Sequence, residues 1–161
     1  PGSGKSRLRM ELLERLAAQL SPGGVLAVQA PNNREAPAYR ILEALLEETP
    51  WKDRLADAPP QPRIETPDWY IGKLHALGFA VSLWETIYHH RMPDAEAIVE
   101  WMKGTTLTPI LATLPEADAA EFLVEMTRSV SGAYRSGPAG VIFPFRRLFF
   151  VAQALATGGL R

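Results

Sequence analysis

The chain has 161 residues, of which 47% are hydrophobic and 22% are charged, and its formal net charge at pH 7 is -1. This composition is typical of one soluble domain with a substantial core. The near-neutral charge gives no electrostatic basis for binding nucleic acid or an anionic membrane surface. No apolar run approaches the roughly 20 residues that span a bilayer. The absence of cysteine excludes disulfides and thiol chemistry, so we expect a cytoplasmic protein.

The first part of the chain has the pattern of one step in an α/β sheet. Apolar spacing over residues 10–20 predicts an amphipathic helix, which Ser21-Pro22-Gly23-Gly24 ends. The nearly uninterrupted apolar run over 25–30 is typical of a strand covered on both faces. A helix, a tight turn and a buried strand together predict a doubly wound α/β arrangement.

Further elements follow from periodicity and from turn residues. We expect helices over 37–46, 68–77, 94–103, 109–115 and 116–134, strands over 79–88 and 141–154, and a proline-rich loop or cap, rather than sheet, over 49–67. Asp68 and Asp94 are the expected N-caps, and Gly104 is placed to end a helix. Pro144 predicts that the last strand becomes regular only after it. We divide the chain into a junction or disordered segment (1–9), one partial domain (10–155) and a frayed tail (156–161).

The opening Pro-Gly-Ser-Gly-Lys-Ser imitates the end of a phosphate-binding loop, in which backbone amides and a lysine hold nucleotide phosphates. The pattern lacks its first glycine and its preceding strand, and no later strand ends in a metal-holding Asp. A junction is the preferred interpretation. A nucleotide-binding module that uses Gly2 to Ser6 remains the alternative, as does a non-catalytic α/β remnant that pairs through an unfinished sheet edge.

The densest group of aromatic and polar residues lies in 84–109, WETIYHHRMPDAEAIVEWMKGTTLTP. Such density at the carboxyl end of a strand predicts a ligand site. Strand alternation places four of its side chains on one face, namely Trp84, Thr86, Tyr88 and His90. Metal binding is not expected, because His89 and His90 point to opposite faces and the remaining histidine is His75.

Several segments resemble one enzyme family in order and spacing. Leu-Ser-Pro-Gly-Gly-Val-Leu at 20–26 resembles the motif before the fifth strand of class I S-adenosylmethionine-dependent methyltransferases. The segments 25–32, 84–92, 94–109 and 145–152 are similar to the trans-aconitate 2-methyltransferase family, most specifically Ile-Val-Glu-Trp-Met-Lys-Gly-Thr at 98–105. The resemblance covers roughly residues 10–154. It implies the carboxyl-terminal half of a Rossmann-like sheet, with about three strands, flanking helices, and a last strand that is antiparallel and lies between the two before it.

The resemblance also implies an enzyme, an O-methyltransferase that acts on a carboxylate of a small polycarboxylic acid such as trans-aconitate. In that family S-adenosylmethionine is held mainly by an amino-terminal half, through a Gly-rich loop and an acidic residue that this sequence lacks. The chain alone is therefore expected to bind the methyl donor poorly. Since a carboxylate nucleophile is already ionised, no general base is needed and no catalytic residue is predicted. Thr108 stands where the family has an arginine.

The candidate site residues combine aromatic, cationic and hydroxyl groups suited to an anionic acid. The predicted substrate contacts are Tyr88, His90, Trp84, Lys103, Thr105, Arg147 and Trp69, and the predicted methyl-donor contact is Asn32. Structural alternatives stay open for several of them: rim packing for Tyr88, solvation for His90, the helix dipole for Lys103, an ion pair for Arg147, and loop anchoring for Trp69 with Tyr70. The expected partner is a small carboxylic acid, with self-association through an unfinished sheet edge left open.

Overall fold

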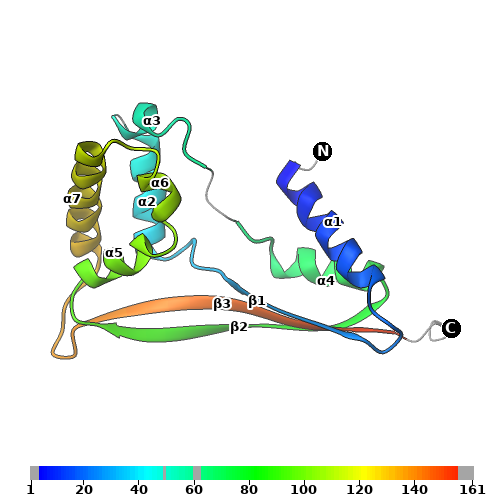
Figure 1. Cartoon of the computed structure of the whole chain (residues 1–161). Helices are drawn as coiled ribbons and strands as arrows, with labels where there is room; N and C mark the ends of the chain where they lie inside the picture. Colours follow the sequence, from blue (N-terminus) through cyan, green and yellow to red (C-terminus); the bar gives the residue numbers. More distant parts are fainter. Residues whose placement is uncertain (1–3, 49, 60–62, 156–161) are drawn as a thin grey trace. The chain divides into compact units, whose positions relative to one another are not determined.

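The computed structural model describes residues 4–48, 50–59 and 63–155 (Figure 1). Its residues fall into two compact units. The first unit comprises 1–31, 64–86 and 146–161, and the second comprises 32–63 and 87–145. Two long strands, β2 (Phe79–Met92) and β3 (Val141–Ala154), contribute residues to both units.

The sheet of the described residues has three strands in the order β1-β3-β2, so the last strand of the chain lies between the two earlier ones. Strand β1 (Val25–Pro31) runs antiparallel to β3, in a register from Val25 opposite Gln153 to Pro31 opposite Arg147. The mixed α/β fold and this strand order confirm the architecture predicted from the resemblance.

Helices α1 (Gly4–Ala18) and α4 (Pro67–Ala76) belong to the first unit. Their apolar side chains form one core with alternate residues of the strands, and its buried members are Leu13, Tyr70, Leu74, Phe79, Leu148, Phe150 and Ala152. Helix α1 begins six residues before the predicted helix, since 4–9 contain no residue that breaks a helix. Helix α4 is capped by Thr66 and not by Asp68: the Thr66 hydroxyl accepts a hydrogen bond from the Trp69 amide at 3.3 Å. Proline prefers the first turn of a helix, so Pro67 begins α4 and the cap lies at Thr66, two residues before Asp68.

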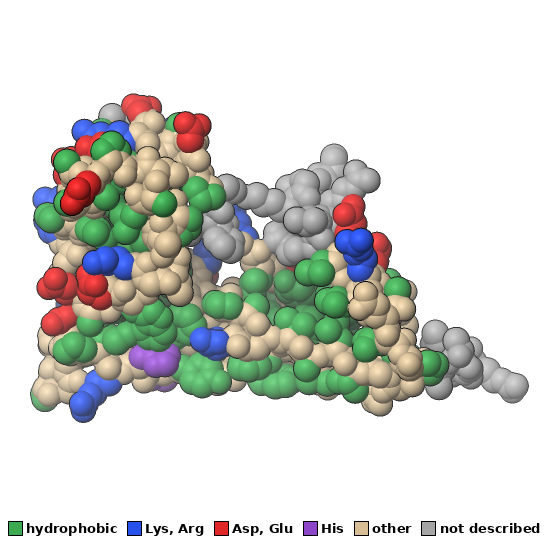
Figure 2. Space-filling view, viewed as in Figure 1, with side chains coloured by type: hydrophobic (Ala, Val, Ile, Leu, Met, Phe, Trp, Pro, Cys, Tyr) green, Lys and Arg blue, Asp and Glu red, His purple; other side chains and the backbone are tan. Residues whose placement is uncertain are grey.

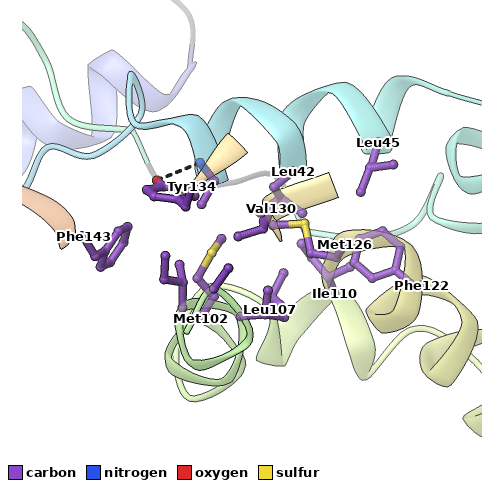
Figure 3. Close-up of a cluster of buried hydrophobic side chains, with 14 of the residues drawn as sticks. Leu42, Leu45, Met102, Leu107, Ile110, Phe122, Met126, Val130, Tyr134 and Phe143 are labelled. Atoms are coloured by element: carbon purple, nitrogen blue, oxygen red, sulfur yellow. Dashed lines mark hydrogen bonds between the residues drawn. The ribbon is translucent and has the colours of Figure 1, made fainter. Parts of the chain in front are cut away.

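Five helices belong to the second unit: α2 (Pro37–Glu47), α3 (Trp51–Arg54), α5 (Glu96–Lys103), α6 (Thr108–Leu111) and α7 (Glu116–Ala133). Figure 3 shows their side chains meeting in a second core, in which Leu42, Met102, Ile110, Phe122, Met126 and Val130 are at most 1% exposed. The Asp94 carboxylate accepts a hydrogen bond from the Ala97 amide at 2.9 Å, as its predicted capping role requires.

The structure refines or corrects four local predictions. The region 49–67, predicted as loop or cap rather than sheet, contains the four-residue helix α3, which Trp51 anchors in the core at 1% exposure. Strand β2 continues to Met92, four residues beyond its predicted end. Strand β3 includes Pro144, which lies outside its paired register with β1 and so removes no hydrogen bond from that ladder. Gly104 is the C-cap of α5, as predicted, and its φ of -69° shows that it ends the helix without the left-handed conformation of a typical C-terminal glycine.

Strand β1 is covered on one face only, where both were expected to be buried. Its residues alternate between exposed and half-buried, and Val25 is 52% exposed. Leu26 and Val28 pack against the first core, whereas Val25 and Ala27 point the other way. The apolar run was therefore a correct signal for a strand but not for its burial in this chain.

The buried positions of β3 change parity between the two units. Val141, Phe143 and Phe145 are buried in the second unit, whereas Leu148, Phe150 and Ala152 are buried in the first. The first set has odd numbers and the second has even numbers, so one regular alternation does not serve both cores. The change falls at Arg146 and Arg147, two charged residues in the middle of the strand.

Candidate functional site

Four rings gather in the second unit around the carboxyl end of β2. Tyr88 and His90 stack at 6.2 Å with an interplanar angle of 17°, and the His90 ring meets the Trp101 ring edge to face at 4.6 Å. Trp101 in turn stacks on Phe145 at 5.2 Å. We call these four residues the aromatic cluster. The contact between Tyr88 and His90 agrees with the predicted alternation, which places them on one face.

The aromatic cluster is accessible at one end and packed at the other. Tyr88 is 42% exposed and His90 is half-buried, whereas Phe145 is buried at 6% exposure. The space-filling view likewise shows a histidine side chain bordered by hydrophobic ones (Figure 2). A phenol and an imidazole held by rings beneath them can donate hydrogen bonds to an anionic ligand with little loss of side-chain freedom. Trp101 has a sufficient packing role on the apolar face of α5.

Lys103 and Thr105 lie at the end of α5 and have local partners. The Lys103 ammonium forms an ion pair with Glu100 at 2.8 Å, and its side chain is 38% exposed. The Lys103 carbonyl accepts a hydrogen bond from the Thr108 hydroxyl at 2.6 Å. Thr105 is exposed, and its amide donates to the Met102 carbonyl at 3.2 Å. These contacts favour a helix-ending role for Lys103, and the Thr108 hydroxyl contributes to the same turn.

Three predicted substrate contacts, Trp84, Trp69 and Arg147, lie in the first unit. Trp84 is 46% exposed and stacks on Phe149 at 5.5 Å with an interplanar angle of 5°. Trp69 is half-buried against the first core and meets Tyr70 edge to face at 5.2 Å. Tyr70 itself packs on Phe150, so the aromatic pair anchors α4.

Arg147 and its neighbour Arg146 lie in β3 at the point where the buried positions change parity. Arg147 is half-buried and lies opposite Pro31 in the sheet register. The neighbouring Arg146 makes an ion pair with Glu85 at 3.4 Å, in which both side chains are partly exposed.

Asn32 directly follows β1 and is half-buried. A side chain at this point lies at the carboxyl end of a strand, where ligands bind in open α/β sheets. The adjacent Asn33 is buried at 5% exposure, a position that the sequence did not single out. The Pro-Asn-Asn sequence could have indicated it, because consecutive asparagines after a strand are typical of a structured turn.

The buried Tyr134 and the half-buried Tyr39 were not singled out from the sequence. The Tyr134 hydroxyl accepts a hydrogen bond from the Ala38 amide at 3.2 Å and thereby satisfies a free N–H in the first turn of α2 (Figure 3). Tyr39 forms a hydrogen bond with Thr106. Burial raises the pKa of both phenols above the ordinary value of 10.0, and the hydrogen bonds oppose the shift in part.

These raised pKa values predict a loss of stability in alkali. The unfolded tyrosines release their protons near pH 10, whereas the folded ones keep theirs to higher pH. The folded state then binds more protons, so the free energy of unfolding falls as pH rises above about 10. Urea unfolding between pH 8 and 11 should show a steeper fall for the unchanged chain than for the double variant Tyr39→Phe and Tyr134→Phe. Equal slopes would contradict the assignment.

Searches for other kinds of site gave two findings. Within residues 4–48, 50–59 and 63–155, no group of three or more His, Cys, Asp or Glu side chains could hold a metal ion. Across the same ranges, no helix is long and apolar enough to cross a membrane.

Comparison with known proteins identifies the chain's relatives. No protein-family model matches it. It is 42% identical over 135 residues to trans-aconitate 2-methyltransferase of Streptomyces avermitilis, covering 83% of this chain and 50% of the relative. It is 40% and 41% identical to the enzymes of the same name from Paracidovorax citrulli and Variovorax paradoxus, covering 90% and 91% of this chain and 56% and 57% of the relatives. The chain matches the carboxyl-terminal part of the trans-aconitate 2-methyltransferase family. It spans about half the length of these relatives.

The resemblance implies S-adenosylmethionine as the methyl donor, and the described residues fit only part of a site for it. The glycines with positive φ are Gly23, Gly78 and Gly140, and each lies shortly before a strand. A loop that cradles a nucleoside-bearing donor instead follows a strand and opens a helix. Asn32 fits a donor contact by its place after β1, but the described residues do not make a complete donor site.

Proposed function

We propose that this chain forms the substrate-side part of an S-adenosylmethionine-dependent O-methyltransferase that acts on a carboxylate of a small polycarboxylic acid similar to trans-aconitate. The observation that carries the proposal is the identity of about 40% to enzymes of that name across 83–91% of this chain. The half-exposed aromatic cluster at the end of β2 supports it, because it offers hydrogen-bond donors where an anionic ligand would lie.

The chemistry of this reaction fits the residues available. A carboxylate attacks a methyl group on a sulfonium, the new carbon–oxygen bond forms as the carbon–sulfur bond breaks, and no proton has to be removed. The protein then contributes orientation and the exclusion of water. We therefore assign no catalytic residue. The remaining carboxylates of the acid need cationic or hydroxyl partners.

We assign substrate binding to seven residues, Tyr88, His90, Trp84, Lys103, Thr105, Arg147 and Trp69. Tyr88 and His90 come first, since the His90 ring is held against Trp101 and the Tyr88 ring stacks on His90. Lys103 is weaker because its charge is already paired with Glu100. We assign Asn32 to the methyl donor and place the rest of the donor site in the part of the relatives that this chain does not match.

The test uses a chimera in which the amino-terminal half of the Streptomyces avermitilis enzyme precedes this chain. It is mixed with S-adenosylmethionine and trans-aconitate, and methyl ester is measured by mass spectrometry. Methyl transfer supports the proposal, and binding of the donor without turnover of any di- or tricarboxylic acid contradicts it.

The residue assignment is tested with His90→Phe in the same chimera. The phenyl ring keeps the contact with Trp101 but removes the N–H donors, so KM for the acid should rise roughly tenfold or more, the loss typical of a hydrogen bond to a charged group. His89→Phe is the matched control, because the exposed His89 points to the other face of β2. Equal KM values in the two variants would remove His90 from the site.

The alternatives remain distinguishable from this function. For the nucleotide-binding module, Gly2 lies outside the described residues and Gly4 begins α1; undiminished ATP binding after Lys5→Ala would count against it. Self-association of a non-catalytic remnant is tested by sedimentation, where a folded monomer argues against it. A cytoplasmic location remains a proposal based on the absence of cysteine.

A further inference from the structure

We propose that Tyr39 is a further substrate-binding residue, whose phenol donates a hydrogen bond to a carboxylate of the acid while Thr106 orients that phenol. The inference rests on the proposed function, because it supplies a donor that such an acid needs. Tyr39 lies in the first turn of α2, and Thr106 lies in the turn between α5 and α6. Both side chains are half-buried, and both belong to the second unit.

Tyr39 has a packed ring and a hydroxyl hydrogen that it can donate. The ring packs against the second core. Burial raises the pKa of Tyr39, and a hydrogen bond with Thr106 lowers it in part. A bond that lowers the pKa of a phenol is one donated to its oxygen, because such a bond stabilises the phenolate. The Tyr39 hydrogen then remains for a ligand, since Thr106 is the hydrogen-bonding partner of Tyr39 among the described residues.

The state of this phenol at neutral pH favours a carboxylate as the acceptor. Because its pKa is raised, Tyr39 keeps its proton and carries no negative charge that would repel an anion. An O–H group that donates to a carboxylate makes a charge-assisted hydrogen bond, which is stronger than a bond between neutral groups. Partial burial strengthens the bond further, because the local dielectric constant is lower than that of water.

The turn that contacts Tyr39 also carries two predicted substrate contacts. Thr106 directly follows Thr105, and Lys103 lies three residues before Thr106 at the end of α5. The Thr105 amide donates a hydrogen bond to the Met102 carbonyl at 3.2 Å, which holds the backbone of this turn. The turn therefore keeps the predicted contacts close to the phenol of Tyr39.

A second set of contacts joins the start of α2 to the aromatic cluster. The amide of the residue before Tyr39 donates to the Tyr134 hydroxyl, and the Tyr134 ring meets the Phe143 ring at 6.0 Å (Figure 3). Phe143 in turn meets Trp101 at 5.5 Å, and the Trp101 ring contacts His90. Tyr39 thus lies at one end of a continuous set of contacts that has His90 at the other.

Other groups of the turn are already engaged, so an additional donor is useful there. The Lys103 ammonium is paired with Glu100 at 2.8 Å, and the Thr108 hydroxyl donates to the Lys103 carbonyl at 2.6 Å. A polycarboxylic acid presents several carboxylates, and each one that leaves water needs hydrogen-bond partners in the protein. The aromatic cluster offers donors for one carboxylate, and Tyr39 offers a donor for another.

The experiment measures the binding of acids to the chimera defined above, saturated with S-adenosylhomocysteine so that no methyl transfer occurs. Isothermal titration calorimetry gives dissociation constants for trans-aconitate and for itaconate, mesaconate and cis-glutaconate, each of which lacks a different carboxylate of trans-aconitate. Tyr39→Phe removes only the phenolic oxygen. It should weaken trans-aconitate and two of the dicarboxylic acids roughly tenfold, the loss typical of a hydrogen bond to a charged group. The third dicarboxylic acid, which lacks the carboxylate bound by Tyr39, should bind unchanged.

Equal weakening of all three dicarboxylic acids would mean that Tyr39→Phe disturbs the site in general, and no weakening would mean that Tyr39 contacts no carboxylate. Either result overturns the inference. If the unchanged chimera binds none of the acids, the proposed function itself is contradicted and the inference falls with it. Tyr134→Phe is the matched control, because the Tyr134 hydroxyl already has a backbone partner, and it should leave every dissociation constant nearly unchanged.

Substitutions of Thr106 test its positioning role. Thr106→Val keeps the shape of the side chain but lacks the hydroxyl, so it should weaken the same acids as Tyr39→Phe by a smaller factor. Thr106→Ser keeps the hydroxyl and should bind the acids like the unchanged chimera. Equal weakening by valine and serine would mean that the hydroxyl does not orient Tyr39, and this part of the proposal would fail.

Discussion

Alanine at Gly140 is expected to lower the free energy of unfolding by at least about 3 kcal/mol. Gly140 has φ of 86°, in the left-handed region, where a side chain alone costs about 1–2 kcal/mol. A Cβ there would also overlap the carbonyl oxygen of Met92 and press on that of Pro93 at 3.1 Å. Both contacts are with backbone, so neither can be relieved by a side-chain rotation. Urea unfolding followed by circular dichroism measures the loss.

Gly132→Ala is the control for that substitution. Gly132 lies in α7, and a Cβ there would meet nothing within 4 Å. Alanine in a helix is favoured over glycine by up to about 1 kcal/mol, so this variant should be slightly more stable than the unchanged chain. If both variants lose the same stability, the special conformation of Gly140 is not the cause.

Phe122→Ala is expected to cost about 3–5 kcal/mol, the usual range for removing a buried aromatic ring. Phe122 is fully buried on α7 and meets Trp51 edge to face at 5.1 Å. Trp51 also donates a hydrogen bond from Nε1 to Glu125 at 2.6 Å, so loss of the Phe122 ring loosens the contact between α3 and α7. The measurement is again the free energy of unfolding in urea.

Val124→Ala provides the comparison on the same helix. Because Val124 is 71% exposed, its truncation should change stability by no more than about 0.5 kcal/mol. A large loss at Val124 or a negligible one at Phe122 would mean that the helix buries a different face.

Periodicity predicted most of the helices because their buried residues recur at helical spacing. Ile98 and Met102 are buried as expected on α5, and Phe122, Met126 and Val130 are buried on α7. The strand order came instead from the resemblance, since the pairing of β3 with β1 joins residues more than 100 positions apart. Local patterns carry no information on such pairings.

The features that were not predicted depend on contacts between residues that are distant in the sequence or on elements that the sequence of one strand does not identify. The apolar run over 25–30 predicts a buried Val25, yet Val25 is 52% exposed. Burial requires a covering element, which the sequence of one strand does not identify. The Tyr134 to Ala38 hydrogen bond joins residues 96 positions apart. The adjacency of Tyr88 and His90 was predictable, because strand alternation is local, but the position of Trp101 beneath them was not.

The parity change in β3 has a consequence for insertions and deletions. Three positions separate Phe145, which points into one core, from Leu148, which points into the other. Loss or gain of one residue at Arg146 and Arg147 reverses the direction of every later side chain and would expose Leu148 and Phe150 to water. Loss or gain of two residues preserves the direction. Natural length variation in this strand should therefore occur in steps of two.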